Sequence, residues 1–276
     1  MSTFIKKLIT GLLFSSSVFL FSFSPCLAAD NTTTTVQFVP VQDGYYAVAG
    51  TEAADIETSY RTGLAIMDSA YKEAGGLSYL NVRFLHKGGT YTMVLSAADV
   101  QTLQTMHAQT NSWLAQNMPA IVPAGSTKQN AVKLTADWIA DHMTYDHSSM
   151  LDRKTLISYQ NAMSCFTKGK GVCTTYATAF DAMVNYLPFN AAGTVDYTCA
   201  APVHKDTKLV TNDEHAWSAI LESDGWHLYD VTFYDNDDKA RKANYLDMSL
   251  ATTNDGYHSN IRTNFSALQA IAYSGK

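Results

Sequence analysis

Three residue types that together can perform nucleophilic catalysis occur in the order Cys, His, Asp in the second half of the chain. Cys173 lies in KGKGVCTTYATAF, His215 in NDEHAWSAIL and Asp230 in WHLYDVTFYD. A thiol needs a base to become a good nucleophile at neutral pH, and that base needs a third group to hold its ring. The combination predicts a thiol enzyme that acts on amides.

Cys173 stands at the start of a predicted helix. Apolar residues from Tyr176 to Leu187 fall on one helical stripe, and Pro188 ends it. The unpaired N–H groups and the positive end of the helix dipole favour a thiolate at this position. Gly169 and Gly171 allow a close approach of the backbone, so we expect the Cys173 N–H to help bind an oxyanion.

A predicted hairpin relates His215 to Asp230. Glu222–Gly225 is a turn signal between the two strands that hold these residues. A two-residue loop at Ser223–Asp224 pairs position 217 with position 230. His215 and Asp230 then share one face of the sheet on a diagonal of roughly 7–8 Å, which their side chains can bridge. A loop one residue longer or shorter would place Asp230 on the opposite face.

Each of these residues also has a structural interpretation when taken alone. Cys173 is then a buried thiol at a helix start, His215 a hydrogen-bonded strand histidine and Asp230 a strand-end residue. Their joint occurrence favours catalysis. We interpret His204, His227 and His258, which have no comparable partners, as structural or surface residues. We interpret His142 and His147, near Asp146, as part of a solvated loop. No Cys-x-x-Cys or His-x-x-x-His spacing occurs among them, so neither a metal nor another cofactor is predicted.

Helices dominate the first part of the chain and strands the last part, which predicts an α+β fold with a largely antiparallel sheet. The best internal boundary is Pro119–Gly125. The predicted helices span residues 54–74, 96–117, 127–143 and 151–166. The predicted strands flank the turn at Asp43–Gly44, form a hairpin of 79–86 with 90–95, and span 194–199, 216–221 and 226–233.

Residues 1–29 have the pattern of a secretory signal peptide. Two lysines precede an apolar run, Leu8–Phe23, and small residues follow it as a cleavage site. The run of about 16 residues is shorter than the roughly 20 that a spanning helix needs. We therefore expect a secreted or extracytoplasmic protein with no integral membrane span after signal removal. Lipid anchoring at Cys26 is less favoured, because Pro25 precedes it.

Charge and cysteine content limit the partners and the redox state. The net charge of −6 becomes −8 without the two signal-peptide lysines, so nucleic acid is not an expected partner. In an oxidising compartment the odd number of remaining thiols leaves at least one unpaired. A disulfide between Cys165 and Cys199 would leave Cys173 free, and three free thiols are the equally plausible alternative.

The motifs together resemble the transglutaminase-like superfamily of papain-fold thiol enzymes, in particular its secreted bacterial members. The resemblance covers residues 127–250. It rests on GKGVC followed by a helix with Tyr176, HAW on a strand, W-x-x-x-D-x-T (Trp226, Asp230, Thr232) on the next strand, and the flanking Tyr145–Asp146 and Tyr245–Ser249.

This resemblance implies a papain-like core in which an N-terminal helical subdomain packs on an antiparallel sheet. It assigns residues 126–276 to a catalytic domain, with residues 30–125 a preceding α+β region of unknown role. Cys173 would be the nucleophile, His215 the general base and then acid, and Asp230 the residue that orients His215. Gln160 is a candidate for an additional oxyanion donor.

The implied reaction is acyl transfer from a protein or peptide amide through a thioester, without a cofactor. Water as the acceptor makes a peptidase or amidase, which we favour for a small exported chain. A lysine amine as the acceptor makes a crosslinking enzyme. A non-catalytic binding module on the same fold is the third interpretation.

Overall fold

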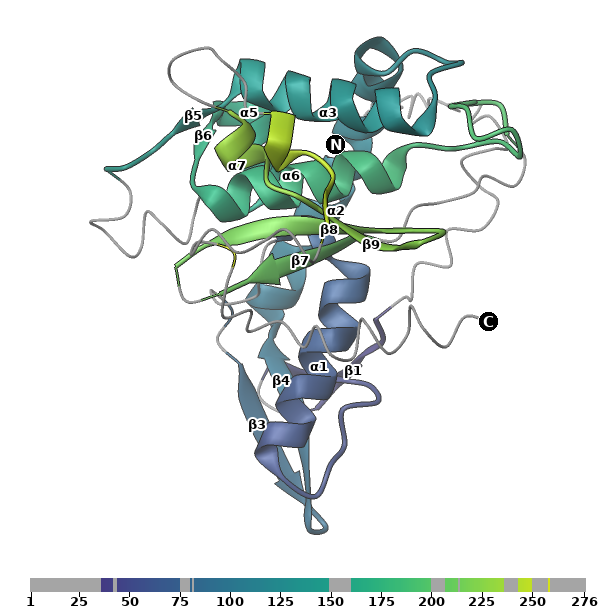
Figure 1. The fold of residues 1–276 in the computed structure, drawn as a ribbon. Helices are drawn as coiled ribbons and strands as arrows, with labels where there is room; N and C mark the ends of the chain where they lie inside the picture. The colour runs from purple at the N-terminus through teal and green to yellow at the C-terminus, as the bar shows by residue number, and fades with distance from the viewer. Residues whose placement is uncertain are drawn as a thin grey trace, which may run out of the picture.

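A long buried helix, α6 (Cys173–Tyr186), lies between a group of helices and an antiparallel sheet. Figure 1 shows α3 (Lys128–His142) and α5 (Ala162–Lys168) on one side of α6. On the other side lie strands β7 (Thr207–Thr211), β8 (Ala216–Glu222) and β9 (Gly225–Tyr229). Every residue of α6 from Thr175 to Val184 is buried, because both of its flanks are covered. The predicted α+β class is confirmed.

The structure is a computed structural model. It describes residues 36–41, 44–74, 80, 82–148, 160–199, 207–212, 214–235, 243–249 and 258. The predicted signal peptide, most of the predicted helix 151–166, and His204 lie outside this part of the chain. No helix within it is both long and apolar enough to cross a membrane.

The sheet beside α6 is antiparallel, in the order β10-β9-β8-β7. Its strands are β7 (Thr207–Thr211), β8 (Ala216–Glu222), β9 (Gly225–Tyr229) and β10 (Met248–Ser249). The β8–β9 hairpin pairs Leu221 with Trp226 and Glu222 with Gly225, so the predicted register is the observed one. Ser218 on β8 donates a hydrogen bond of 3.2 Å to the carbonyl of Ala177 and so ties the sheet to α6.

Two strand predictions in this region are wrong. The strand predicted to reach Phe233 ends at Tyr229, because Asp230 caps a short helix, α7 (Val231–Tyr234), by accepting a hydrogen bond from the Phe233 N–H. The strand predicted at 194–199 is reduced to isolated bridges at Thr194 and Val195. The Asp196 side chain accepts from the Thr198 N–H and bends the chain there.

The N-terminal part forms a second antiparallel sheet in the order β1-β2-β4-β3, against which α1 packs. Both predicted strand pairs are confirmed, and the predicted helix 54–74 divides into α1 and a 3₁₀ turn. The elements are β1 (Phe38–Pro40), β2 (Tyr45–Val48), α1 (Ile56–Ala70), η2 (Lys72–Ala74), β3 (Arg83–Lys87) and β4 (Thr90–Ser96).

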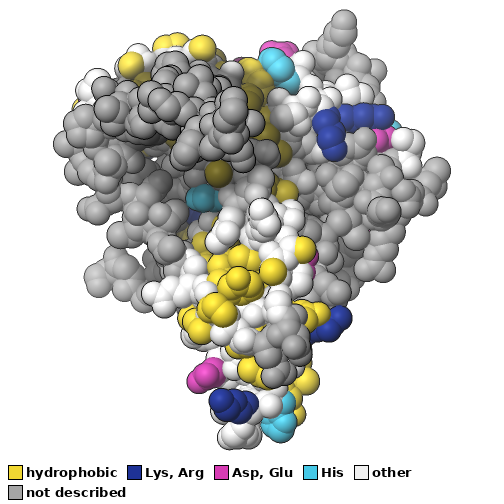
Figure 2. Space-filling model, turned by 180° about the vertical axis from the view of Figure 1, so that it is seen from behind, with side chains coloured by type: hydrophobic (Ala, Val, Ile, Leu, Met, Phe, Trp, Pro, Cys, Tyr) yellow, Lys and Arg dark blue, Asp and Glu magenta, His cyan; other side chains and the backbone are white. Residues whose placement is uncertain are grey.

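The surface of this N-terminal part carries apolar side chains, visible in the lower half of Figure 2. Among the residues that the structure describes, the exposed large apolar residues belong to this part: Val39, Val41, Ile56 and Tyr60.

One helix, α2 (Ala97–Ile121), takes part in two of the three apolar clusters of the described residues. Its first turns bury Val100 and Leu103 with the N-terminal sheet, and its last turns bury Leu114 and Met118 with α3 and α6. The helix passes the predicted end at residue 117, because Met118 is anchored in the central cluster and accepts a hydrogen bond from Val122. The proposed division between residues 125 and 126 stays a prediction.

A buried acid lies in the middle of α6. Asp181 is 1% exposed, and its Oδ1 has no hydrogen-bond partner among the described residues. Burial raises the pKa of Asp181 to about 7, against smaller opposing effects of Ser218 and Lys72. Because the pKa is higher in the folded than in the unfolded state, this carboxyl stabilises the fold at low pH. Its contribution is lost as pH rises from about 4 to about 7.

Asp181→Asn should therefore reduce the loss of stability between pH 5 and pH 8. We expect the variant to gain about 1–3 kcal/mol over the wild type across this range. Urea unfolding at both pH values measures the difference, with Asp141→Asn, an exposed acid on α3, as the control. A pH dependence identical to that of the wild type would contradict a neutral Asp181.

Candidate active site

His215 and Asp230 meet at the end of the β8–β9 hairpin. His215 precedes β8 and Asp230 follows β9, and Nε2 of the imidazole lies 2.6 Å from Oδ2 of the carboxylate. The Asp230 side chain is fully buried, and that of His215 is 8% exposed. The imidazole stacks on Phe233, with 4.8 Å between ring centroids, so its orientation is fixed by packing as well as by the carboxylate.

Cys173 is the first residue of α6 and lies beside the same imidazole. Its side chain forms a hydrogen bond with His215 and is partly accessible to solvent. Because Nε2 of His215 contacts Asp230, the other ring nitrogen, Nδ1, is left to exchange a proton with the thiol. The structure thus brings the three predicted residues together, and their catalytic roles stay a prediction.

The charges of this group depend on one another. Burial lowers the pKa of His215, but hydrogen bonds with Asp230 and Cys173 outweigh this and raise it to about 10. Burial alone would raise the pKa of Asp230, but hydrogen bonds from His215 and His258 hold it below its usual range. At neutral pH the group therefore contains a carboxylate beside an imidazolium.

Backbone pairing just before α6 fixes the position of Cys173. β5 (Thr144–Tyr145) pairs in parallel with β6 (Lys170–Gly171). A Cβ at Gly171 would lie 2.2 Å from Oγ1 of Thr175, and this oxygen accepts a hydrogen bond of 3.1 Å from the Val172 N–H at the helix start. Position 171 must therefore be glycine for the helix to begin where it does.

Tyr145 is a member of the site that the sequence identified only as a flanking residue. Burial raises the pKa of Tyr145 to about 12, and the charge of Cys173 adds to the increase. Its phenol makes hydrogen bonds with the Cys173 side chain and backbone N–H, so it occupies the N–H that was predicted to bind an oxyanion. The ring also stacks on Tyr176, at 6.3 Å between centroids. Neutral at physiological pH, this phenol can donate a hydrogen bond beside the sulfur.

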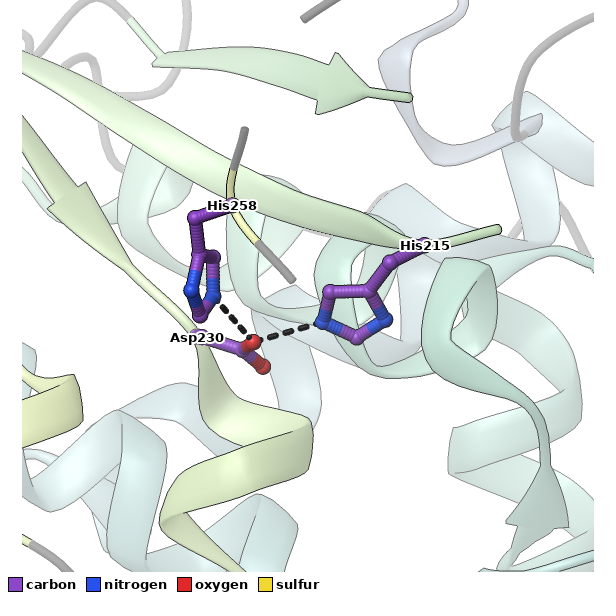
Figure 3. A group of neighbouring side chains, drawn as sticks. All are labelled: His215, Asp230 and His258. Atoms are coloured by element: carbon purple, nitrogen blue, oxygen red, sulfur yellow. Dashed lines mark hydrogen bonds and ion pairs between the residues drawn. The ribbon is translucent and has the colours of Figure 1, made fainter. Parts of the chain in front are cut away.

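The prediction that His258 has no comparable partner is wrong. His258 is 1% exposed, and its Nε2 lies 2.9 Å from Asp230 Oδ2, so the carboxylate has an imidazole on either side (Figure 3). His227 also has acidic partners, Asp224 and Asp247, but it lies closer to the surface. No local pattern points to His258, because it reaches the site from beyond β10.

Two further predictions concern Gln160 and the thiols of Cys165 and Cys199. Gln160 is partly exposed and precedes Asn161, the cap of α5; its role as an oxyanion donor stays a prediction. The hypothesis of a Cys165–Cys199 disulfide is wrong, because Cys165, Cys173 and Cys199 are all free. Cys165 is buried in the apolar cluster under α5, whereas Cys199 lies in the turn after Asp196 and is partly exposed.

A metal site is the alternative use of this cluster, because the ligand atoms of His215, Asp230 and His258 lie within 4.8 Å of one another. Ligand atoms of a tetrahedral zinc site are about 3.4 Å apart, because each bond is about 2.1 Å long. The separations of 2.6 and 2.9 Å between the ring nitrogens and Asp230 Oδ2 are shorter. They fit hydrogen bonds rather than a shared cation.

Alkylation of Cys173 tests this geometry. In the folded protein at pH 6, Cys173 should react with iodoacetamide faster than Cys165 or Cys199, because an imidazolium stands beside its sulfur. Replacement of His215 by Ala should slow the reaction at least about tenfold. Mass spectrometry of the labelled peptides gives the three rates. Equal rates for the wild type and His215→Ala would contradict the contact.

Gly171→Ala should slow the same alkylation several-fold and lower the melting temperature, because the added methyl group displaces the Thr175 hydroxyl that caps α6. Gly63→Ala is a matched control: its Cβ would meet the flexible Met93 side chain in the N-terminal cluster, far from the thiol. The control should change stability alone. If both variants slowed alkylation equally, the effect would not come from the start of α6.

Comparison with known proteins gives a match to one family model over part of the chain. Residues 114–231, which contain Cys173, His215 and Asp230, match the family model described as the transglutaminase-like superfamily. None of the curated proteins matches the chain. Among solved structures, one titled "Crystal structure of a TGase" is similar, with a TM-score of 0.36 and 15% identity. The match covers 58% of this chain and 46% of that one, so the chain spans less than half of that protein's length.

Proposed function

We propose that the protein transfers acyl groups from peptide or side-chain amides through a thioester. The match of residues 114–231 to the transglutaminase-like superfamily, which includes Cys–His–Asp acyl-transfer enzymes, supports this proposal. Cys173 is the nucleophile, His215 the acid and base, and Asp230 the residue that orients His215. One observation carries the proposal: a single imidazole contacts the Cys173 thiol with one edge and the buried carboxylate, at 2.6 Å, with the other.

In the first half-reaction the Cys173 thiolate attacks the carbonyl carbon of the substrate amide. The C–S bond forms, and the negative charge moves to the carbonyl oxygen. Collapse of this tetrahedral intermediate breaks the C–N bond. The His215 imidazolium gives its Nδ1 proton to the leaving amine, and Asp230 holds the ring in the required orientation throughout. The products are a free amine and a thioester on Cys173.

In the second half-reaction an acceptor attacks the thioester. Neutral His215 takes a proton from the acceptor, the C–S bond breaks, and the thiolate–imidazolium pair is restored. Water as the acceptor yields a carboxylic acid, and a primary amine yields a new amide. We propose hydrolysis, hence a cysteine peptidase or amidase. Its support is the resemblance to small exported members of the superfamily. Crosslinking of glutamine to lysine side chains is the alternative, because it requires the same three residues.

A non-catalytic binding module is the rival from another class. Such a protein has no need of a thiol and a carboxylate on either side of one imidazole. The buried Asp230 carboxylate would then be costly to retain, because burial of a charge must be offset by hydrogen bonds. Stoichiometric labelling of Cys173 at mildly acidic pH would favour an enzyme over a binding module.

The decisive comparison is between the wild type and Cys173→Ala, with Cys199→Ala as the matched control for loss of a partly exposed thiol. Each protein is offered a glutamine donor with a fluorescent primary amine, and separately a mixed peptide library. New peptide ends or released ammonia in the wild type and the control, but not in Cys173→Ala, are expected. Incorporation of the amine would instead establish crosslinking. Activity that survives in Cys173→Ala would exclude the thioester mechanism.

A further inference from the structure

The buried carboxylate of Asp230 accepts more hydrogen bonds than a Cys–His–Asp group requires. Its Oδ2 lies 2.6 Å from His215 Nε2 and 2.9 Å from His258 Nε2, and its Oδ1 accepts from the Phe233 N–H at 3.0 Å. Figure 3 shows the two imidazoles approaching the same oxygen from different directions. A carboxylate can only accept, so each ring must present its Nε2–H to Asp230.

Packing fixes the His258 ring in this position. It stands edge-on to Trp217 and Phe233, with centroids 4.9 and 5.6 Å away, and Tyr245 lies at 6.0 Å. The side chain has no exposed surface. Because its surroundings are aromatic and dry, the hydrogen bond to Asp230 is stronger than it would be in water. His258 also lies outside residues 114–231, the region that matches the family model.

The direction of the His258 hydrogen bond determines its effect on the orientation of the Asp230 carboxylate. His215 donates a hydrogen bond to Oδ2 from one side, and the Phe233 N–H donates one to Oδ1 at the start of α7. His258 adds a second hydrogen bond to Oδ2 from another direction, so it opposes rotation of the carboxylate about its Cβ–Cγ bond together with the Phe233 N–H. A rotation of a few tens of degrees would misalign the hydrogen bond between Asp230 Oδ2 and His215 Nε2. The imidazole would then turn, and its Nδ1 edge would no longer face Cys173.

We propose that His258 is a positioning residue, whose Nε2–H holds the Asp230 carboxylate in the orientation that directs His215 toward Cys173. The proposal deepens the proposed function and rests on it. The role assigned to His258 is exerted through its hydrogen bond to Asp230, not on the thiol or the reacting bond.

A pH effect should accompany this role. The titratable groups around Asp230 are His215 and His258 on Oδ2, with Cys173 and Tyr145 on the far side of His215. The hydrogen bond from His258 helps to hold the pKa of Asp230 below its usual range. Its loss therefore raises that pKa, so Asp230 becomes protonated at higher pH and releases His215. The acidic limb of the activity profile should move upward.

Two variants separate the hydrogen bond from the packing. His258→Phe keeps an aromatic ring but cannot donate, and His258→Gln loses the ring but carries an amide N–H at a similar distance from the backbone. In His258→Phe we expect kcat to fall about 10–100-fold, with KM within about twofold and the acidic limb at higher pH. In His258→Gln kcat should recover to within about fivefold of the wild type. Thermal unfolding establishes that both are folded.

The alkylation rate of Cys173 against pH, measured in the same variants, needs no substrate and so distinguishes the two proposals. If the wild type turns over no amide but only His258→Phe shifts the alkylation profile, the proposed function fails and the positioning role stands. An unshifted profile in His258→Phe, or equal defects in both folded variants, would overturn the positioning role.

Two measurements remain valid even if a variant does not fold. Nitrogen-15 NMR of the wild type should show His258 protonated at Nε2, and an unprotonated Nε2 would overturn the proposal. Mass spectrometry after addition of zinc should show no stoichiometric zinc. Stoichiometric zinc in the wild type that shifts the nitrogen-15 signal of His258 Nε2 would also overturn it, because the metal would occupy the nitrogen that must donate.

Discussion

The site depends on one buried carboxylate and on the donors that make its burial possible. A charge removed from water is retained only where hydrogen bonds replace its hydration. Asp230 meets this requirement with donors from three parts of the chain: His215 before β8, the Phe233 N–H in α7, and His258 beyond β10. The carboxylate that orients His215 also caps α7, so rotation of this side chain would break a helix cap as well as the contact with the imidazole.

The sulfur reaches this carboxylate–imidazole pair because of the backbone before α6. The pairing of β5 with β6 and the absence of a side chain at Gly171 let α6 begin at Cys173. The same helix continues into the core, where the sheet that carries His215 packs along it. The distance between thiol and imidazole is thus set by helix–sheet packing rather than by a flexible loop, as catalysis of proton transfer requires.

Local patterns predicted the parts of this arrangement that depend on local interactions. The β8–β9 register followed from the turn at Ser223–Asp224 and strand alternation, and the start of α6 followed from its apolar stripe. The end of β9 could not be predicted in this way. Asp230 suits both a strand end and a helix cap, and only the tertiary fold selects between them. His258 could not be found from spacing, since it meets Asp230 through tertiary structure. Cys165 and Cys199 are both free, although a count of thiols allowed a disulfide between them, because pairing depends on tertiary structure rather than on number.

The helix α2 has a consequence for the N-terminal third of the protein. Since its two halves belong to different apolar clusters, a cut at residue 126 would strip Leu114 and Met118 from the core that supports α3 and α6. The N-terminal sheet and the half of the protein that contains Cys173 are therefore connected through the packing of one helix, α2. The helix runs without a break for about seven turns between the two clusters. The two halves should therefore melt as one cooperative unit.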